Sequence, residues 1–343
     1  MKKLSILLII VILIFGSVAC YKEIKEEPEE EAQALKVVMV ASEGGLGDKS
    51  FNDMAYEGVL RAASDYDIEV SVIEPENSAD YISSLTNAAS EGANLIIAVG
   101  YVQGDEMTVI AEQYPETYFA VVDSDAEAPE NVMSLSFKEQ EGSFLVGVIA
   151  ALTTETDIVG FVGGGEEPTI EKFEYGFRSG VKAINPDAQV LVDYTECFDD
   201  QDLGRKTALA LIEGGADVIY HASGECGIGV IDAAGEKGVW AIGVDRDQSA
   251  LNPEAVLCSM FKRVDNAVYL AIQSLAENDF EGGIYEFGLD FEAVGYADGA
   301  GNLPEEVRQQ ADAYAAAILA GDIYVPKDRG EFEGFVVPEE GLL

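Results

Sequence analysis

The sequence is short of the side chains on which most enzyme chemistry depends. It contains one histidine, His221, and four cysteines among 343 residues. Any histidine-dependent mechanism would rest on that one residue, and neither Gly-x-Ser-x-Gly nor His-Glu-x-x-His occurs. The cysteines lack metal-ligand spacing, so we expect no metal and no cofactor. Acidic residues are abundant, which leaves a two-carboxylate hydrolase open as an enzymatic alternative.

Basic residues are also scarce. The chain has 20 Lys and Arg against 64 Asp and Glu, a formal net charge of −44. This balance excludes nucleic acid as a partner, because a duplex would be repelled. It disfavours binding flat on anionic lipid. Repulsion on this scale predicts a fold that gains stability with added salt.

Long hydrophobic runs are absent after residue 20. The first twenty residues carry Lys2 and Lys3, then an apolar run and small residues, the pattern of a secretory signal. Cys20 follows Val18-Ala19, which resembles the bacterial lipobox, although Ser17 stands where leucine is usual. We expect Cys20 to be lipidated and to anchor the chain to the outer side of the cell membrane. A plain cleaved signal and a retained anchor are the alternatives.

The next segment, 21–35, is rich in glutamate and is predicted to be an acidic tether, too charged to pack. From there on, strand-like and helix-like runs alternate. Continuous Val/Ile strands indicate burial on both faces, and alternation with helices predicts parallel sheets built from right-handed units. The expected strands include 37–40, 95–99, 118–122, 158–162, 217–220 and 239–244, and the expected helices include 53–66, 79–92, 169–183, 201–213, 264–276 and 304–319.

The order of these runs predicts an α/β protein with two doubly wound parallel-sheet lobes joined by a hinge. We assign 36–135 to an N-terminal lobe with a return segment at about 261–290. The C-terminal lobe takes 136–260 and about 291–343. Two such lobes facing a cleft can clamp a small molecule by hinge closure.

The stretch 44–53, Gly-Gly-Leu-Gly-Asp-Lys-Ser-Phe-Asn-Asp, follows the first strand. Carboxyl ends of strands are where α/β folds bind ligands, and glycines there allow close backbone approach. Phe51 is a large ring among turn residues, a candidate stacking platform. The alternatives are that Phe51 packs as a helix staple and that Asp48 is a helix cap. A phosphate-binding loop needs glycine where Glu43 and Asp48 stand.

Four motifs carry a resemblance to a known family. They are Gly47-Asp48-Lys49-Ser50-Phe51-Asn52, the run 137–147 from Phe137 to Gly147, Gly243-Val244-Asp245-Arg246-Asp247-Gln248, and the run 260–265 from Met260 to Asp265. With the lipobox, they make the chain similar to the basic membrane protein family of solute-binding lipoproteins. This family serves ABC importers and includes purine-nucleoside receptors. The resemblance implies a periplasmic-binding-protein type I fold, a monomer, and an ABC permease as membrane partner.

The resemblance also implies a site for a purine nucleoside such as guanosine, inosine or adenosine. Phe51 and Phe198 would sandwich the base from opposite lobes, since stacking on an aromatic ring is worth roughly 1–3 kcal/mol per base. Asn52 and Asp123 would read the purine edge. The remaining implied ligand contacts are Ser42, Asp48, Gly224, Asp245 and Lys262, with Asp245 accepting from the ribose and Lys262 donating to it. Ser42 stands where many nucleoside-binding members carry aspartate.

The acidic residues favour a neutral nucleoside over a nucleotide. A nucleoside hydrolase and a receptor for another polar ligand, such as a sugar, are the alternatives. Several residues also have plainer interpretations: Asp123 and Asp245 as turn caps, Phe198 as core, Tyr101 and Gln103 as loop, 163–165 as a turn, and His221 as structural. At most one disulfide can form among Cys197, Cys226 and Cys258.

Overall fold

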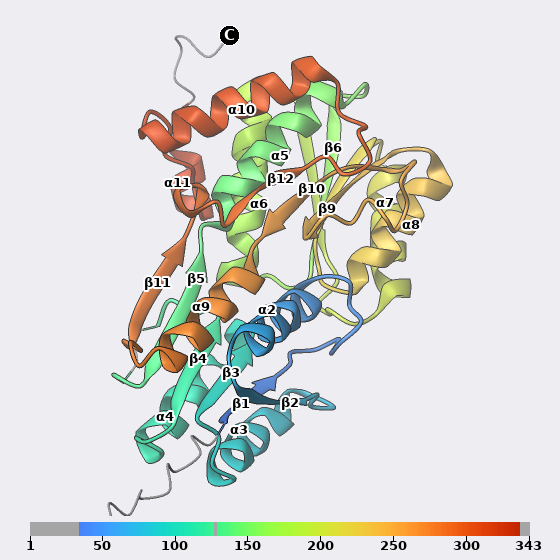
Figure 1. The fold of residues 1–343 in the computed structure, drawn as a ribbon. Helices are drawn as coiled ribbons and strands as arrows, with labels where there is room; N and C mark the ends of the chain where they lie inside the picture. Colours follow the sequence, from blue (N-terminus) through green and yellow to red (C-terminus); the bar gives the residue numbers. More distant parts are fainter. Residues whose placement is uncertain (1–33, 127–128, 337–343) are drawn as a thin grey trace, which may run out of the picture. The chain divides into compact units, whose positions relative to one another are not determined.

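The computed structural model describes residues 34–126 and 129–336. The predicted signal peptide, Cys20 and nearly all of the tether lie outside the described residues. Within them the chain forms two six-stranded sheets, each flanked by helices (Figure 1). The fold is therefore the expected pair of α/β lobes. The strands are β1 (Leu35–Val40), β2 (Ile68–Ile73), β3 (Leu95–Val99), β4 (Tyr118–Val122), β5 (Val132–Phe137), β6 (Ile158–Gly163), β7 (Gln189–Tyr194), β8 (Val218–Ala222), β9 (Trp240–Asp245), β10 (Val256–Lys262), β11 (Gly283–Phe287) and β12 (Val294–Ala297).

The helices follow the same alternation. They are α2 (Phe51–Asp65), α3 (Tyr81–Ser90), α4 (Gly104–Gln113), α5 (Glu139–Thr153), α6 (Pro168–Ile184), α7 (Gln201–Glu213), α8 (Cys226–Lys237), α9 (Val264–Ala276), α10 (Glu305–Ala320) and the short α11 (Arg329–Glu333). No helix in the described ranges is both long enough and apolar enough to cross a bilayer.

The first sheet has the strand order β11-β5-β4-β3-β1-β2, and all its neighbouring strands are parallel. Side chains of β1 alternate between two cores. Val37 and Met39 face one side, where α2 and α9 pack, and Val38 and Val40 face the other, where α3 and α4 pack. Because successive side chains of a strand point to opposite faces, burial on both faces requires the continuous apolar runs in the sequence.

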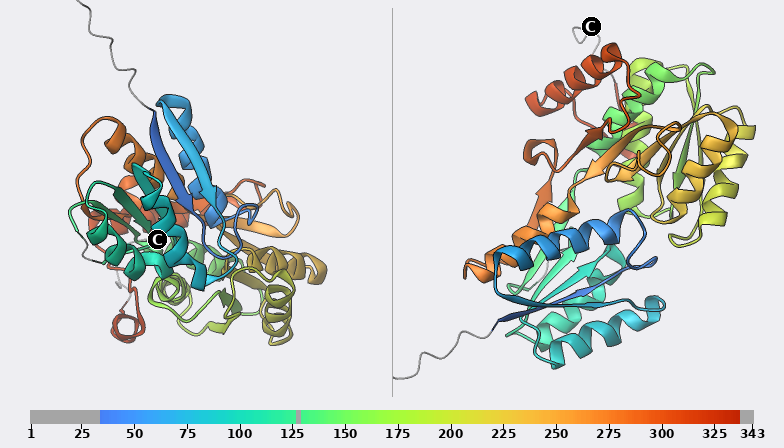
Figure 2. Two further views of the ribbon diagram at one scale, coloured as in Figure 1. Left: turned by 90° about the horizontal axis from the view of Figure 1, so that it is seen from below. Right: turned by 45° about the vertical axis from the view of Figure 1, so that its right-hand side comes forward.

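The second sheet has the order β12-β10-β9-β8-β6-β7. Its strands are parallel except β12, which pairs antiparallel with β10. Helices α7 and α8 pack on each other over one face, and α5 packs along α6 and α10 (Figure 2). This sheet is doubly wound like the first, with one antiparallel edge strand.

The chain passes between the sheets at three places. It crosses from β5 into α5, from β10 into α9, and from β11 into β12. Backbone hydrogen bonds join the third crossing to the other two. The Lys138 N–H of the first crossing donates to the Phe287 carbonyl at 2.9 Å. The Arg263 N–H of the second crossing donates to the Ala293 carbonyl at 2.7 Å. Three adjacent crossings of this kind make a hinge about which two lobes can close.

Candidate functional site

A cavity of about 230 Å³ lies where strands of both sheets end. One ordered water occupies roughly 10–15 Å³ by this measure, so the space suits a small-molecule ligand. The lining residues come from both lobes and lie mostly just after a strand. They are Ser42, Glu43, Asp48, Phe51, Asn52, Tyr81, Gly100, Tyr101, Val102, Asp123, Gly164, Gly165, Glu167, Ile170, Phe173, Glu196, Cys197, Phe198, Ala222, Ser223, Gly224, Val244, Asp245 and Lys262.

The structure brings together all nine residues that the sequence nominated as ligand contacts. Five line the cavity from the first lobe, and Phe198, Gly224, Asp245 and Lys262 line it from the second sheet and its loops. Their separation in sequence exceeds 200 residues. The clustering follows from the parallel sheets, whose strands all end at the same edge.

Asp48 and Asn52 are held by local hydrogen bonds before α2. The Asp48 carboxylate accepts from the backbone N–H groups of Ser50, Asn52 and Asp53 at 2.8–3.1 Å, which satisfies donors left free at a helix N-terminus. The Asn52 amide oxygen accepts from the Ser42 N–H and hydroxyl, and its nitrogen donates to the Glu43 carbonyl and to Asp48. Both polar side chains therefore shape the loop, and all the hydrogen-bonding capacity of the Asn52 amide is used within the protein.

Phe51 and Phe198 approach the cavity from different lobes. Phe51 is the first residue of α2, and Phe198 lies in the loop between β7 and α7. Gly164 makes room for the second ring, because a Cβ built on Gly164 would lie 2.0 Å from Cε1 of Phe198. The sequence predicts only a turn for 163–165, whereas Gly164 lets an aromatic ring lie against the backbone.

Lys262 is the centre of a buried ionic cluster. Its side chain is 1% exposed, and its ammonium lies 2.6 Å from Asp123 Oδ1 and 2.9 Å from Glu139 Oε1. Lys172 lies 3.5 Å from the other oxygen of Glu139. Burial alone favours neutral lysine, but Asp123, Glu139 and Asp245 outweigh it and hold the pKa of Lys262 above its ordinary value. An ammonium has three donors, and Lys262 lines the cavity, so it can also donate to a ligand there.

Asp123 directly follows β4 and Asp245 ends β9, and both have the same unusual conformation. Each has a φ of 66° in the left-handed region, which costs energy for residues other than glycine and is seen often at functional sites. Burial raises the pKa of both carboxyls, and that of Asp245 reaches about 6 despite the opposing effect of Lys262. Asp245 Oδ2 accepts a short hydrogen bond from the Ser50 hydroxyl of the other lobe.

Carboxylates dominate the charge around the cavity. Six Asp and Glu side chains line it against one lysine. Tyr101 lies among them, and burial together with Glu167, Asp123 and Glu43 raises the pKa of its phenol above the ordinary value. The site can therefore accept many hydrogen bonds and opposes anions.

Gln103 and His221 do not line the cavity. Gln103 is buried and donates to the Val99 carbonyl at 2.9 Å, so it supports the sheet edge rather than a rim. His221 is buried, and burial lowers the pKa of its imidazole to about 4. Within the described ranges, Cys197, Cys226 and Cys258 are free thiols, and no group of His, Cys, Asp and Glu has an arrangement that could hold a metal.

Sequence reasoning missed two residues that support the site. Glu139, the first residue of α5, is fully buried and pairs with Lys262. Ser50 contacts Asp245 across the lobes. Glu139 belongs to the motif at 137–147, but a glutamate at the start of a helix looks like an ordinary first-turn acid. The signal available in sequence was its place two residues after the end of a buried strand.

Two α/β lobes joined by three crossings and closed over a cavity at their strand ends define a two-lobed solute-binding protein. Residues 35–329 match the family described as ABC transporter substrate-binding protein PnrA-like, so the chain belongs to that family. As a substrate-binding protein of an ABC transporter, it binds a small-molecule ligand and works with a membrane permease.

Named relatives agree with this assignment. Basic membrane protein A of Borreliella burgdorferi is 34% identical over 306 residues, covering 87% of this chain and 90% of the relative. A Listeria innocua protein named "CD4+ T-cell-stimulating antigen" is 37% identical over 325 residues, covering 88% and 91%. A crystal structure of an ABC transporter solute-binding protein from Aeropyrum pernix superposes with a TM-score of 0.80 at 30% identity, covering 88% of this chain and 96% of that one.

Proposed function

We propose that this protein is the extracytoplasmic receptor of an ABC importer for a purine nucleoside, and that it has no catalytic role. The observation that carries the proposal is the pair of aromatic rings, Phe51 and Phe198, that line one cavity from separate lobes. A flat heterocycle inserted between two rings gains roughly 1–3 kcal/mol from each face. Lobe closure would complete this sandwich.

The polar groups of the cavity suit a ligand rich in donors. Asp123 and Asp245 are buried carboxylates that accept hydrogen bonds, as ribose hydroxyls and purine N–H groups require. Hydrogen bonds to charged groups contribute about 1.5–3 kcal/mol each. Lys262 supplies an ammonium donor to a ligand oxygen. Asn52 is assigned to shaping the loop, because its amide is fully engaged by protein groups.

The surplus of carboxylates selects against phosphate. A nucleoside monophosphate would bring about two negative charges beside Asp123, Asp245 and Glu167, against the single positive charge of Lys262. We therefore assign the neutral nucleoside and not the nucleotide as ligand. We further propose that Cys20 carries the lipid that keeps this receptor at the membrane.

A calorimetric titration with inosine, guanosine and adenosine, each paired with its 5′-monophosphate, tests the assignment. We expect micromolar or tighter binding of at least one nucleoside and at least 100-fold weaker binding of its monophosphate. The variants F51A and F198A should each weaken nucleoside binding about tenfold or more. Chromatography of the incubated nucleoside checks for hydrolysis. Release of free base would contradict a pure receptor, and binding of D-ribose or D-glucose without any nucleoside would contradict the ligand class.

A further inference from the structure

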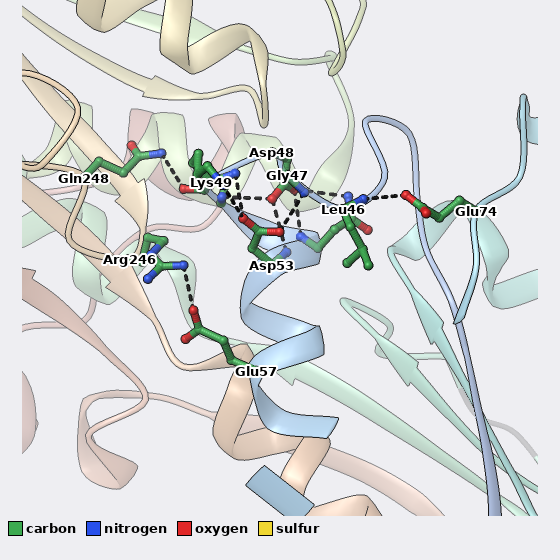
Figure 3. A network of polar contacts seen from close by, with 11 residues as sticks. Leu46, Gly47, Asp48, Lys49, Asp53, Glu57, Glu74, Arg246 and Gln248 are labelled. Atoms are coloured by element: carbon green, nitrogen blue, oxygen red, sulfur yellow. Dashed lines mark hydrogen bonds and ion pairs between the residues drawn. The ribbon is translucent and has the colours of Figure 1, made fainter. Parts of the chain in front are cut away.

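One buried amide crosses from the second lobe to the first outside the ligand cavity. Gln248 follows β9 and is 2% exposed. Its side-chain nitrogen donates to the backbone carbonyl of Lys49, 3.2 Å away in the loop before α2 (Figure 3). Neither residue lines the cavity. This bond therefore joins the lobes without occupying the ligand site.

The direction of the Gln248 amide is fixed by its neighbours. Its oxygen lies 2.9 Å from the backbone nitrogen of Val244, a group that can only donate. The same oxygen lies 3.0 Å from Nε2 of His221, so that nitrogen must carry the proton. With both partners holding the oxygen, the amide N–H groups must face the Lys49 carbonyl, which can only accept. His221 thus orients the amide toward the opposite lobe.

The first lobe presents its carbonyl through an unusual backbone conformation. Lys49 has a φ of 56°, and the preceding loop is fixed by Asp53, which accepts from the Gly47 and Lys49 N–H groups at 2.7 and 3.2 Å (Figure 3). A non-glycine residue held in the left-handed region needs support from its surroundings. Here that support aims the carbonyl at Gln248.

We propose that Gln248, oriented by His221, is a latch that holds the two lobes closed and sets how slowly ligand leaves. This proposal depends on the proposed receptor function only where its tests measure the dissociation of ligand. The neighbouring cross-lobe ion pair of Arg246 and Glu57, at 2.8 Å, is solvent-exposed and contributes little. The Gln248 bond is more sheltered, because Gln248 itself is 2% exposed, and its loss leaves the Lys49 carbonyl without its cross-lobe partner.

Three variants test the latch. Q248M keeps the side-chain volume and removes both polar atoms. H221L removes the orienting N–H, whereas H221Q retains an N–H near the same place. R246A breaks only the exposed pair and serves as the matched control. We expect inosine to dissociate roughly three- to tenfold faster from Q248M and H221L, and within twofold of wild type from H221Q and R246A.

Hydrogen–deuterium exchange of the ligand-free proteins gives a readout that needs no ligand. The latch predicts faster exchange of 46–50, in the opposite lobe, for Q248M and H221L but not for H221Q. If Q248M and H221L exchange faster only within the second lobe, Gln248 has a structural role alone and the latch proposal is overturned. If wild type binds no nucleoside, the receptor proposal fails while this exchange comparison still decides the latch. Folding of each variant is checked by circular dichroism.

Discussion

Asp245 links the acidity of the site to ligand affinity at the scale of a single residue. Burial raises the pKa of its carboxyl to about 6, from an ordinary value of 3.8. The ionised form is the stronger acceptor for a ligand hydroxyl. We expect nucleoside affinity to rise about three- to tenfold between pH 5 and pH 7, measured by calorimetry, with the D245N variant showing a flatter profile.

The raised pKa of Asp245 affects the free energy of unfolding in the opposite direction to ligand affinity. Because the pKa is raised by folding, the contribution of Asp245 to the free energy of unfolding is fully present below pH 3.8 and is lost as the pH rises through about 6. Affinity and stability should therefore move in opposite directions across this range. An equal affinity slope in D245N would assign the titration to another group, such as Asp123.

Gly164 offers a second test at one residue. A methyl group placed there would lie 2.0 Å from the Phe198 ring, whereas one placed on Gly165 would lie at ordinary distance, 3.8 Å or more from its nearest neighbours. We expect G164A to displace the ring and weaken nucleoside binding about tenfold or more, with G165A near wild type. Equal nucleoside affinity of G164A and G165A would show that the Phe198 ring does not contribute to binding.

At the scale of elements, the loop into α2 depends on Asp48. Its carboxylate accepts three backbone N–H groups near the helix N-terminus and is 2% exposed. We expect D48A to lower the free energy of unfolding by about 1–2 kcal/mol, since buried donors lose their acceptor. Urea unfolding followed by circular dichroism measures this. D80A, at a half-buried position whose carboxylate accepts a hydrogen bond from the Asn77 side chain, is the control and should change stability by less than about 0.5 kcal/mol. A similar loss in both variants would contradict the capping role.

The strand ends were predictable from sequence because buried parallel strands have a clear signature. Val37 to Val40 and Leu95 to Val99 are continuous apolar runs, and the residues after such runs must lie at one sheet edge. Phe51, Phe198 and Asp245 were nominated on that basis and from the family resemblance. Contacts between distant segments were not predictable. Nothing local to Gly164 indicates that it faces Phe198, since the contact depends on how two loops pack.

The distinction between lining and supporting residues was also beyond the sequence. Gln103 and Tyr101 are neighbours after β3, yet Tyr101 lines the cavity and Gln103 is buried beneath it. Which of the two side chains faces the cavity depends on the backbone conformation between them. His221 could be predicted as structural, but its hydrogen bond to Gln248 depends on a turn 27 residues later. Pairing of buried polar groups is a tertiary property.

At the scale of the whole molecule, the hinge and the ionic cluster meet. Lys262 ends β10 beside the second crossing, and Glu139 begins α5 beside the first. Lys172 of α6 lies 3.5 Å from Glu139, so charged side chains of α5, α6 and β10 interact beside two of the crossings. A ligand that draws on Lys262 also alters the balance of charge at the hinge. Lys262 therefore belongs both to the ligand cavity and to the charged cluster beside the hinge.

The large negative charge acts over the whole fold. With 64 acidic and 20 basic residues, carboxylates repel one another across the surface of the compact state, and this repulsion is relieved when the chain expands. Salt screens it over a Debye length of about 10 Å at 0.1 M and about 3 Å at 1 M. We expect the melting temperature at pH 7.5 to rise by several degrees between 0.02 and 1 M sodium chloride. Unfolding measured at pH 5 is the control, because partial protonation lowers the repulsion and the salt effect should shrink. A melting temperature that does not rise with salt at pH 7.5 would show that repulsion does not limit the stability of this fold.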